Sequence, residues 1–168
     1  LLAELPQERS QELLELMESD EAADVRRLLS FPEESAGGIM TTDYIAVHPD
    51  LTAEKAIVYL RQSASDMDAI AYIYVTDADE RMLGVMSLHE LVLAEPSVPL
   101  RDIMKKRFVS VSPQDSQDEV ARLIAKYDLR ALPVLDEQRR LHGIVTADDA
   151  LDKILPTKWK KRLPRLYH

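Results

Sequence analysis

The segment Leu83-Gly-Val-Met-Ser-Leu-His-Glu90 has a counterpart in His142-Gly-Ile-Val-Thr-Ala-Asp-Asp149, 59 residues further along the chain. In both segments apolar residues around a glycine are followed by a hydroxyl side chain and, three residues later, by a carboxylate. Similar segments at a fixed spacing indicate an internal repeat. The pair therefore predicts two units of the same fold.

Two further pairs of segments extend the repeat over most of the chain. Residues 39–49 resemble residues 103–113 at an offset of 64, and residues 71–77 resemble residues 130–136 at an offset of 59. The difference predicts a five-residue insertion in the first copy, where the polar residues 63–68 indicate a loop.

Each copy has the same predicted order of secondary structure. An extended piece that meets a proline is followed by a helix, a strand, a hairpin turn that contains Asp, a second strand and a final helix. These elements are predicted at residues 45–47, 52–61, 70–75, 83–86 and 88–94, and again at 109–111, 116–126, 131–135, 141–145 and 147–155. A β-α-β-β-α unit of about 60 residues is too small to bury a generous core alone. The sequence therefore predicts an α+β fold in which the two copies pack through their strands.

Residues 1–30 are predicted to form two short helices. Ser19 suits an N-cap, and Asp20 and Glu21 suit the first turn of the second helix. Helices this short do not bury an apolar face by themselves. We therefore expect them to be the end of a helical domain or a cap on the repeats.

The composition excludes several classes of protein. The 168 residues include 21 Lys and Arg and 30 Asp and Glu, which gives a net charge of −9 and disfavours a nucleic-acid binder. The charge is uneven, because residues 1–155 carry −14 and residues 156–168 carry +5. The absence of cysteine excludes disulfides, a thiol nucleophile and a cysteine-based zinc site.

No stretch of the sequence is suited to crossing a bilayer. The longest apolar run, residues 69–75, is far shorter than the roughly 20 residues that a spanning helix needs. The chain begins with Leu-Leu-Ala-Glu, which lacks both an initiator Met and the basic region of a signal peptide. We therefore expect a piece of a longer chain, with any membrane function outside it.

Two sets of motifs resemble known families. Met40 and Met104 open the copies and Gly-x-x-[Ser/Thr]-x-x-[Asp/Glu] closes them, so that residues 38–155 resemble a CBS-domain pair, or Bateman module. More narrowly, Ser35-Ala-Gly-Gly-Ile-Met-Thr-Thr42, the strand at 70–75 and residues 117–134 resemble the cytosolic region of MgtE-type magnesium transporters.

This resemblance implies a division of the chain and a function. Residues 1–36 would be the last helices of the family's N domain, 37–98 the first CBS domain, 99–155 the second, and 156–168 a basic tail. The family implies a cytoplasmic, Mg²⁺-sensing module that forms a homodimer through its CBS domains and regulates a pore domain in the inner membrane. The basic tail departs from the acidic connecting helix of the family, which leaves open a relative without a pore.

The resemblance also implies a set of Mg²⁺ ligands, and Mg²⁺ prefers oxygen ligands and keeps several waters. Asp149 and Asp152 are three residues apart and would share a helix face. The pattern departs from the family at Ser116, where the family has an acid. The candidate positions, including two backbone ones, are Gly38, Asp118, Glu119, Ala125, Asp128, Asp149 and Asp152.

Each of these carboxylates also has a plainer interpretation. Asp118 and Glu119 suit the stabilisation of a helix N-terminus. Asp152 suits solvated surface. Asp20, Glu21 and Asp24 are interpreted as partners of a helix dipole rather than as ligands.

An alternative function is the binding of ATP or another adenine nucleotide, as in many CBS pairs. The resemblance implies that Tyr72 stacks on the base, that Thr146 reaches phosphate and that Asp149 accepts from the ribose. His89 and Glu90 stand where the family has Arg and Asp, which weakens both contacts. The plainer interpretation of Tyr72 is a strand residue that packs beneath a helix. The candidate nucleotide residues are Tyr72, Ser87, His89, Glu90, Thr146 and Asp149.

The sequence favours a regulatory protein over an enzyme. It has no phosphate-binding P-loop motif, and its four histidines lack ligand spacing. Ser87 and His89 lie near one another without a nucleophile–base–acid set. Three hypotheses remain: an Mg²⁺-sensing module, a stand-alone adenine-nucleotide sensor, and a dimerisation scaffold.

Overall fold

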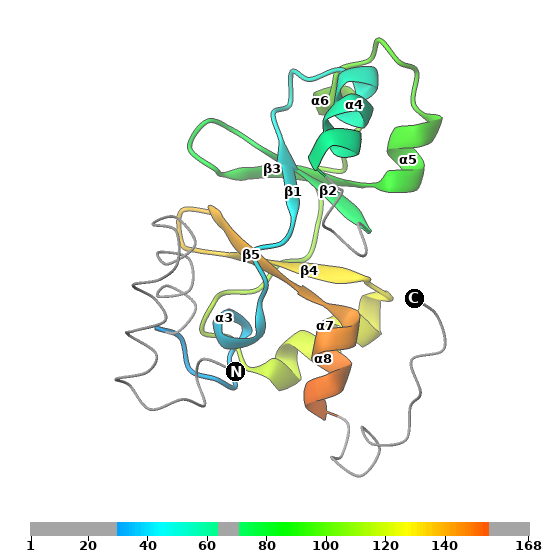
Figure 1. Cartoon of the computed structure of the whole chain (residues 1–168). Coiled ribbons are helices and arrows are strands. Elements are labelled where there is room, and N and C mark those ends of the chain that lie inside the picture. The colour runs from blue at the N-terminus through cyan, green and yellow to red at the C-terminus, as the bar shows by residue number, and fades with distance from the viewer. Residues whose placement is uncertain (1–29, 64–70, 155–168) are drawn as a thin grey trace.

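A computed structural model describes residues 30–63 and 71–154, and it confirms the predicted α+β fold of two repeats (Figure 1). The predicted N-terminal helices, most of the predicted insertion loop and the basic tail lie outside the described residues. Element labels follow Figure 1, in which the two repeats lie one above the other and meet through their strands.

The first repeat contains a three-stranded sheet with the order β1-β2-β3. β1 pairs in parallel with β2, and β2 pairs antiparallel with β3, with Tyr74 opposite Val85. Two helices belong to this repeat and a short one follows it. The elements are β1 (Ile45–Val47), α4 (Ala53–Ser63), β2 (Tyr72–Thr76), β3 (Met82–Ser87), α5 (Leu88–Leu93) and α6 (Leu100–Ile103).

The second repeat has only two paired strands. It contains α7 (Gln117–Tyr127), β4 (Ala131–Leu135), β5 (Leu141–Thr146) and α8 (Ala147–Ile154), and α3 (Ala36–Ile39) packs against it. The extended piece predicted at 109–111 forms a single parallel bridge, between Val111 and Val134. The Val111 N–H donates to the Pro133 carbonyl at 3.0 Å. Pro133 has no N–H with which to donate in return, so the pairing does not extend into a longer strand.

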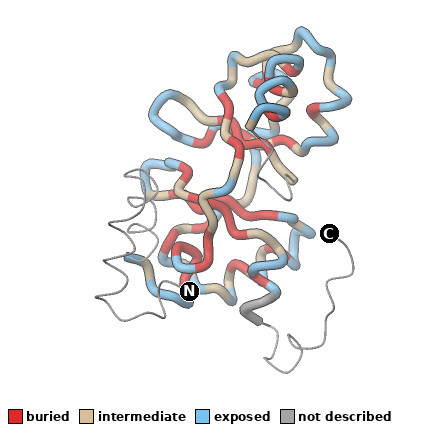
Figure 2. Tube along the Cα trace, viewed as in Figure 1, coloured by how far each residue is buried: buried red, intermediate tan, exposed pale blue. Residues whose placement is uncertain are grey.

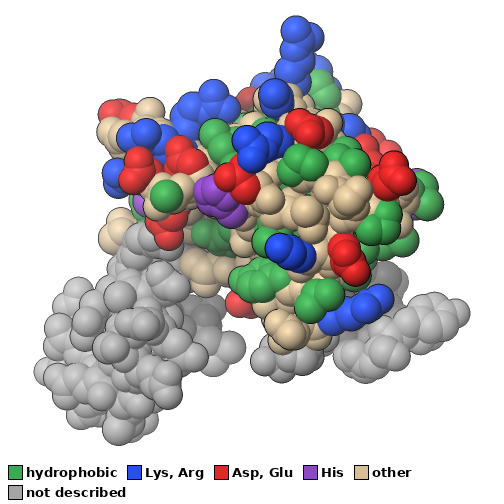
Figure 3. All heavy atoms as spheres, turned by 90° about the horizontal axis from the view of Figure 1, so that it is seen from above, with side chains coloured by type: hydrophobic (Ala, Val, Ile, Leu, Met, Phe, Trp, Pro, Cys, Tyr) green, Lys and Arg blue, Asp and Glu red, His purple; other side chains and the backbone are tan. Residues whose placement is uncertain are grey.

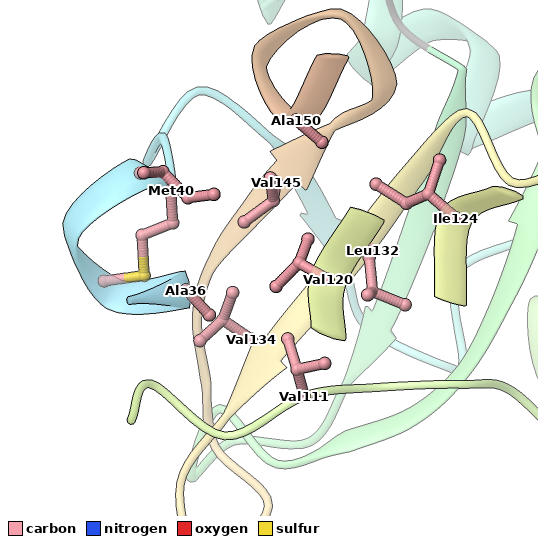
Figure 4. Close-up of a cluster of buried hydrophobic side chains, with 10 residues drawn as sticks. Ala36, Met40, Val111, Val120, Ile124, Leu132, Val134, Val145 and Ala150 are labelled. Atoms are coloured by element: carbon pink, nitrogen blue, oxygen red, sulfur yellow. The ribbon is translucent and has the colours of Figure 1, made fainter. Parts of the chain in front are cut away.

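Three apolar clusters account for the core. One fills the first repeat beneath α4 and α5, and a second fills the other repeat between α3, α7, α8 and the strands (Figure 4). The third joins the repeats and includes Tyr74, Met82 and Ile144. The buried residues accordingly follow the strands in Figure 2. This third cluster explains how two small units share one stable core.

The segments that open the two repeats cross over to the opposite repeat. Thr41 exchanges two backbone hydrogen bonds with Ile144 of β5, at 2.8 and 2.9 Å. Lys105 likewise exchanges two with Val85 of β3, at 2.8 and 3.0 Å. Each repeat therefore borrows a backbone partner from the other.

A glycine faces the crossing methionine in each repeat. A Cβ at Gly84 would lie 2.7 Å from Met104 Sδ, and a Cβ at Gly143 would lie 2.8 Å from both Met40 Sδ and the Thr41 carbonyl oxygen. The glycine in each closing motif is therefore required by the close approach of the other repeat.

The two hairpin turns also meet. Asp77 and Asp136 each accept backbone N–H groups of their own turn. Between the turns, Met82 N–H donates to the Arg139 carbonyl at 2.9 Å and Leu141 N–H donates to the Glu80 carbonyl at 3.0 Å. The repeats are thus joined at their turns as well as at their opening segments.

Candidate functional site

A cavity of about 810 Å³ lies where strands and helices of both repeats meet. Its volume falls in the range of about 300–1,000 Å³ that is typical of small-molecule sites. Both repeats contribute equivalent positions, because the end of β3 and the start of α5 face the end of β5 and the start of α8. The lining consists of Asp43, Tyr44, Ile45, Ala71, Tyr72, Tyr74, Ser87, Leu88, His89, Asp128, Arg130, Ala131, Ile144, Thr146, Ala147, Asp148 and Leu151.

Tyrosines form an aromatic part of this lining. Tyr72 and Tyr74 point to the same face of β2 because side chains alternate along a strand. The Tyr72 hydroxyl accepts the Arg130 N–H at 3.4 Å, and the Tyr44 and Tyr74 rings meet edge to face at 6.1 Å. The predicted stacking residue Tyr72 therefore does line the cavity, half-buried rather than sealed beneath a helix.

Tyr74 is the most deeply buried polar side chain of the cavity. It is only 1% exposed, and its hydroxyl has no hydrogen-bond partner among residues 30–63 and 71–154. Burial, together with the neighbouring Tyr72, raises the pKa of Tyr74 above its ordinary value. A buried hydroxyl without a partner is costly, and this one belongs to the packing between the repeats rather than to the open surface of the cavity.

Ser87 and Glu90 cap α5. Ser87 Oγ accepts the Glu90 N–H at 3.1 Å, and the Glu90 carboxylate accepts the Ser87 N–H at 2.9 Å, which is a reciprocal capping box. Lys105 Nζ lies 2.6 Å from Glu90 Oε1. The hydrogen bond from Lys105, with that from Ser87 N–H, lowers the pKa of Glu90 to about 2. Ser87 lines the cavity, whereas Glu90 is held outside the lining.

Thr146 and Asp149 repeat this arrangement at α8. The Thr146 hydroxyl donates to Asp149 Oδ2 at 2.6 Å and accepts the Asp149 N–H at 3.3 Å. Thr146 lines the cavity and Asp149 does not. The structure therefore brings Tyr72, Ser87, His89 and Thr146 of the predicted nucleotide set together, but not the two carboxylates.

The charged lining residues were mostly missed from the sequence. Asp43, Arg130 and Asp148 reach the cavity from three different segments, and Asp128 was predicted only as a metal ligand. The sequence did contain a signal for Asp148, because this residue occupies the position in the second closing motif that His89 occupies in the first. Asp43 and Arg130 had none, because only the packing of the repeats brings them together.

Among the described residues, the predicted metal ligands do not form a cluster within one chain. No group of three His, Cys, Asp or Glu side chains that could hold a metal ion occurs within the described part of the chain. Asp118 and Ala125 lie exposed on α7, and Asp128 ends this helix in the left-handed conformation at φ 50°. Asp152 lies on α8, with its side chain outside the described residues.

Two of the predicted metal positions already have structural partners. Glu119 binds Arg122 Nε at 2.8 Å, and this hydrogen bond holds the pKa of Glu119 below its usual range. Gly38 donates its N–H to Ser35 Oγ at 3.2 Å, and a Cβ there would lie 2.2 Å from the Pro32 carbonyl oxygen. Both residues are thus accounted for by local structure, whether or not they also contact an ion.

Apolar side chains remain exposed on the outer helices. Val92 and Leu93 of α5 are 60% and 71% exposed, and Val58 and Tyr59 of α4 are each 45% exposed. Figure 3 looks onto the end that carries these helices and shows apolar side chains among charged ones. Exposed apolar residues on adjoining helices are typical of interaction surfaces.

The comparisons with known proteins agree with this architecture. The sequence model of the CBS domain matches residues 36–97 and 100–156. The magnesium transporter MgtE of Thermus thermophilus is 44% identical over 142 residues, which are 84% of this chain and 32% of the relative. MgtE of Bacillus subtilis is 38% identical over the same shares of the two chains, so this chain spans about a third of the curated relatives.

Solved structures show the same relationship. A crystal structure of the cytosolic domain of the Mg²⁺ channel MgtE in complex with ATP matches with a TM-score of 0.83 and 44% identity, over 88% of this chain and 59% of the other. The soluble part of a magnesium transporter matches with a TM-score of 0.87 and 36% identity, over 92% and 60%. In residues 30–63 and 71–154, the helices are too short or too polar to traverse a bilayer.

Proposed function

The chain belongs to the CBS-domain family and is related to the cytosolic region of MgtE magnesium transporters, and from this premise we propose that it regulates magnesium transport. The similarity over most of the chain is the observation that carries the proposal. In this proposal, the module lies in the cytoplasm, senses Mg²⁺ at acidic interfaces and controls a membrane pore. The pore belongs either to the same protein or to a partner. Its role is regulatory rather than catalytic.

The scattered carboxylates suit an ion shared between surfaces better than an ion held in one cage. Asp118 and Asp128 are exposed and lie near opposite ends of α7. Mg²⁺ commonly uses one or two carboxylates and keeps several waters. A second surface, from the preceding helices or from another copy, would complete such a site. Ion binding would reduce repulsion between the acidic surfaces and so favour the closed arrangement.

The exposed apolar residues of α4 and α5 support a homodimer through the CBS domains. A second copy would cover Val58, Tyr59, Val92 and Leu93, which are poorly suited to water. Sedimentation of the Leu93→Glu variant is expected to show loss of the dimer. Gln138→Glu, on an exposed hairpin turn, adds the same charge elsewhere and is expected to leave the dimer intact.

Limited proteolysis and small-angle scattering test the Mg²⁺ response. Millimolar Mg²⁺ is expected to protect the chain and to make it more compact than KCl of equal ionic strength does. Asp128→Asn is expected to weaken the response, and Asp102→Asn, on α6 and away from the predicted positions, is expected to retain it. Identical cleavage and scattering with and without Mg²⁺ would rule the proposal out.

The second candidate function is adenine-nucleotide binding, and the cavity is the observation that favours it. Its volume and the half-buried Tyr72 both fit a nucleoside, and a related structure was solved with ATP. Calorimetry with ATP, ADP and AMP tests this function. Absence of heat with all three at high protein concentration would exclude it and leave the Mg²⁺ response unaffected.

A further inference from the structure

The cavity has an unusual charge for a nucleotide site. Three of its lining residues, Asp43, Asp128 and Asp148, are carboxylates, and all three are exposed. Against them stand Arg130 and His89. Sites for free polyphosphates normally place several cationic groups or unoccupied helix N-termini against the phosphates. The lining is therefore net negative where a polyphosphate would enter.

The helix N-termini at the cavity are already compensated by the chain itself. α8 begins there with Asp148 and Asp149 in its first turn, and α5 begins there with Glu90 in its first turn. These carboxylates offset the positive end of each helix dipole. Lys105, which follows the opening Met104 of the second repeat, is paired with Glu90 at 2.6 Å. A bound phosphate would thus gain little from either helix.

The inner wall has the opposite character. It is built from the rings of Tyr44, Tyr72 and Tyr74 and from apolar side chains. An aromatic and apolar wall suits a neutral ring system. The cavity therefore combines an interior that fits a nucleoside with a rim that repels anions.

We propose that the cavity selects an adenine ligand whose phosphate charge is absent or compensated: it prefers adenosine, or ATP carrying Mg²⁺, to free ATP. This inference rests on the proposed nucleotide binding and adds the charge state of the ligand to it. The expected preference is about tenfold, which is the size of one or two partly screened unit-charge interactions. It would decrease as salt is added.

A metal-free charge series tests the proposal directly. Calorimetry in EDTA with adenosine, AMP, ADP and ATP is expected to show affinity that falls as phosphates are added. Mg²⁺ in excess over ATP is expected to restore the affinity for ATP. Asp43→Asn and Asp148→Asn are expected to bring the ratio of adenosine to free-ATP affinity toward one, whereas the exposed Asp102→Asn, outside the cavity, leaves the ratio unchanged.

The outcomes separate this inference from the function on which it rests. If none of the four ligands binds, the proposed nucleotide function fails, and this inference fails with it. If they bind with affinity that is equal or rises toward free ATP, nucleotide binding stands and the charge selection is overturned. If the ratio responds equally to Asp102→Asn and Asp148→Asn, the rim is not its source and the proposal is likewise overturned.

Discussion

The two repeats share the contacts that join them and differ in the wall that they present to the cavity. Tyr72 and Tyr74 of β2 correspond to Ala131 and Pro133 of β4. The aromatic wall therefore comes from the first repeat alone. The packing of both repeats requires duplicated contacts, whereas a single ligand requires specialised residues from only one of them.

Substitutions of the two glycines test the contacts that both repeats share, and they are expected to change the free energy of unfolding the most. Gly143→Ala is expected to lower the free energy of unfolding by about 2–3 kcal/mol and Gly84→Ala by about 1–2 kcal/mol, because overpacking forces neighbours to move. The difference is expected because the Cβ at Gly143 would lie 2.8 Å from the Thr41 carbonyl oxygen, whereas the nearest backbone atom at Gly84 is 3.0 Å away. Urea unfolding followed by circular dichroism measures both values.

A second substitution separates the two sources of the effect. In a Met40→Ala background the loss caused by Gly143→Ala is expected to be smaller than in the wild type, because the sulfur 2.8 Å away is removed but the carbonyl remains; Met40→Ala alone supplies the reference, since it empties a buried site. A neutral Gly143→Ala would show that the crossing segment yields easily and would contradict the close fit described above.

The aromatic wall tests the difference between the repeats. Tyr72→Ala is expected to weaken ATP binding about tenfold, since stacking of a base on an aromatic ring contributes about 1–3 kcal/mol. Tyr72→Phe keeps the ring and is expected to bind nearly as well. Tyr127→Ala, an exposed tyrosine outside the cavity, serves as the control in the same calorimetric measurement. Equal affinity for Tyr72→Ala and the wild type would remove Tyr72 from the binding site.

Substitutions at the two helix N-caps compare the repeats again, with smaller expected changes in stability. Ser87→Ala is expected to destabilise the protein by about 1 kcal/mol, because it removes an N-cap. Thr146→Ala is expected to have a smaller effect, since the cap bond from the Asp149 N–H to Thr146 Oγ1 is 3.3 Å long, whereas the one from the Glu90 N–H to Ser87 Oγ is 3.1 Å long. Urea unfolding of both variants ranks them, and a larger loss at Thr146 would reverse the order proposed here.

The ion pair between Glu90 of the first repeat and Lys105 of the second gives the smallest expected effect and depends on pH. Glu90 has a pKa of about 2 in the folded protein, against 4.5 for an ordinary glutamate. Its contribution is therefore fully present above pH 4.5 and is lost as the pH falls toward 2. The side chain is 36% exposed, so the contribution is expected to stay below about 1 kcal/mol.

Unfolding free energies measured between pH 5 and 2 check this expectation. Glu90→Gln and Lys105→Met are each expected to flatten the acid limb of the stability curve in that window. An unchanged slope in both variants would show that the pair does not contribute to stability.

The fold was predictable because its signal is repeated. The glycine, hydroxyl and carboxylate of the closing motif recur at a fixed offset, and the strands and helices follow from local patterns. The strand predicted at 109–111 was reduced to a bridge because its partner β4 contains Pro133. The short helix α6 was not predicted, since its four residues carry no periodic pattern.

The site was only partly predictable, for a different reason. Tyr72, Ser87, His89 and Thr146 are marked by the motifs and do line the cavity. Glu90 and Asp149 are marked by the same motifs, but the carboxylate of each accepts a hydrogen bond from the hydroxyl three residues earlier. Tyr44, which precedes β1, and Tyr74 of β2 form a ring contact, which is a consequence of packing that no local pattern reports.

The crossing of the opening segments has a consequence for the order of events during synthesis. Thr41 bonds to Ile144, which leaves the ribosome more than 100 residues later. At translation rates of about 5–20 residues per second, the first segment waits for at least about 5 s before its partner exists. The nascent first repeat therefore exposes Met40 and an unpaired strand edge during that interval. A chain truncated before β5 would present the same edge permanently, which makes it a substrate for chaperones or for pairing with a second chain.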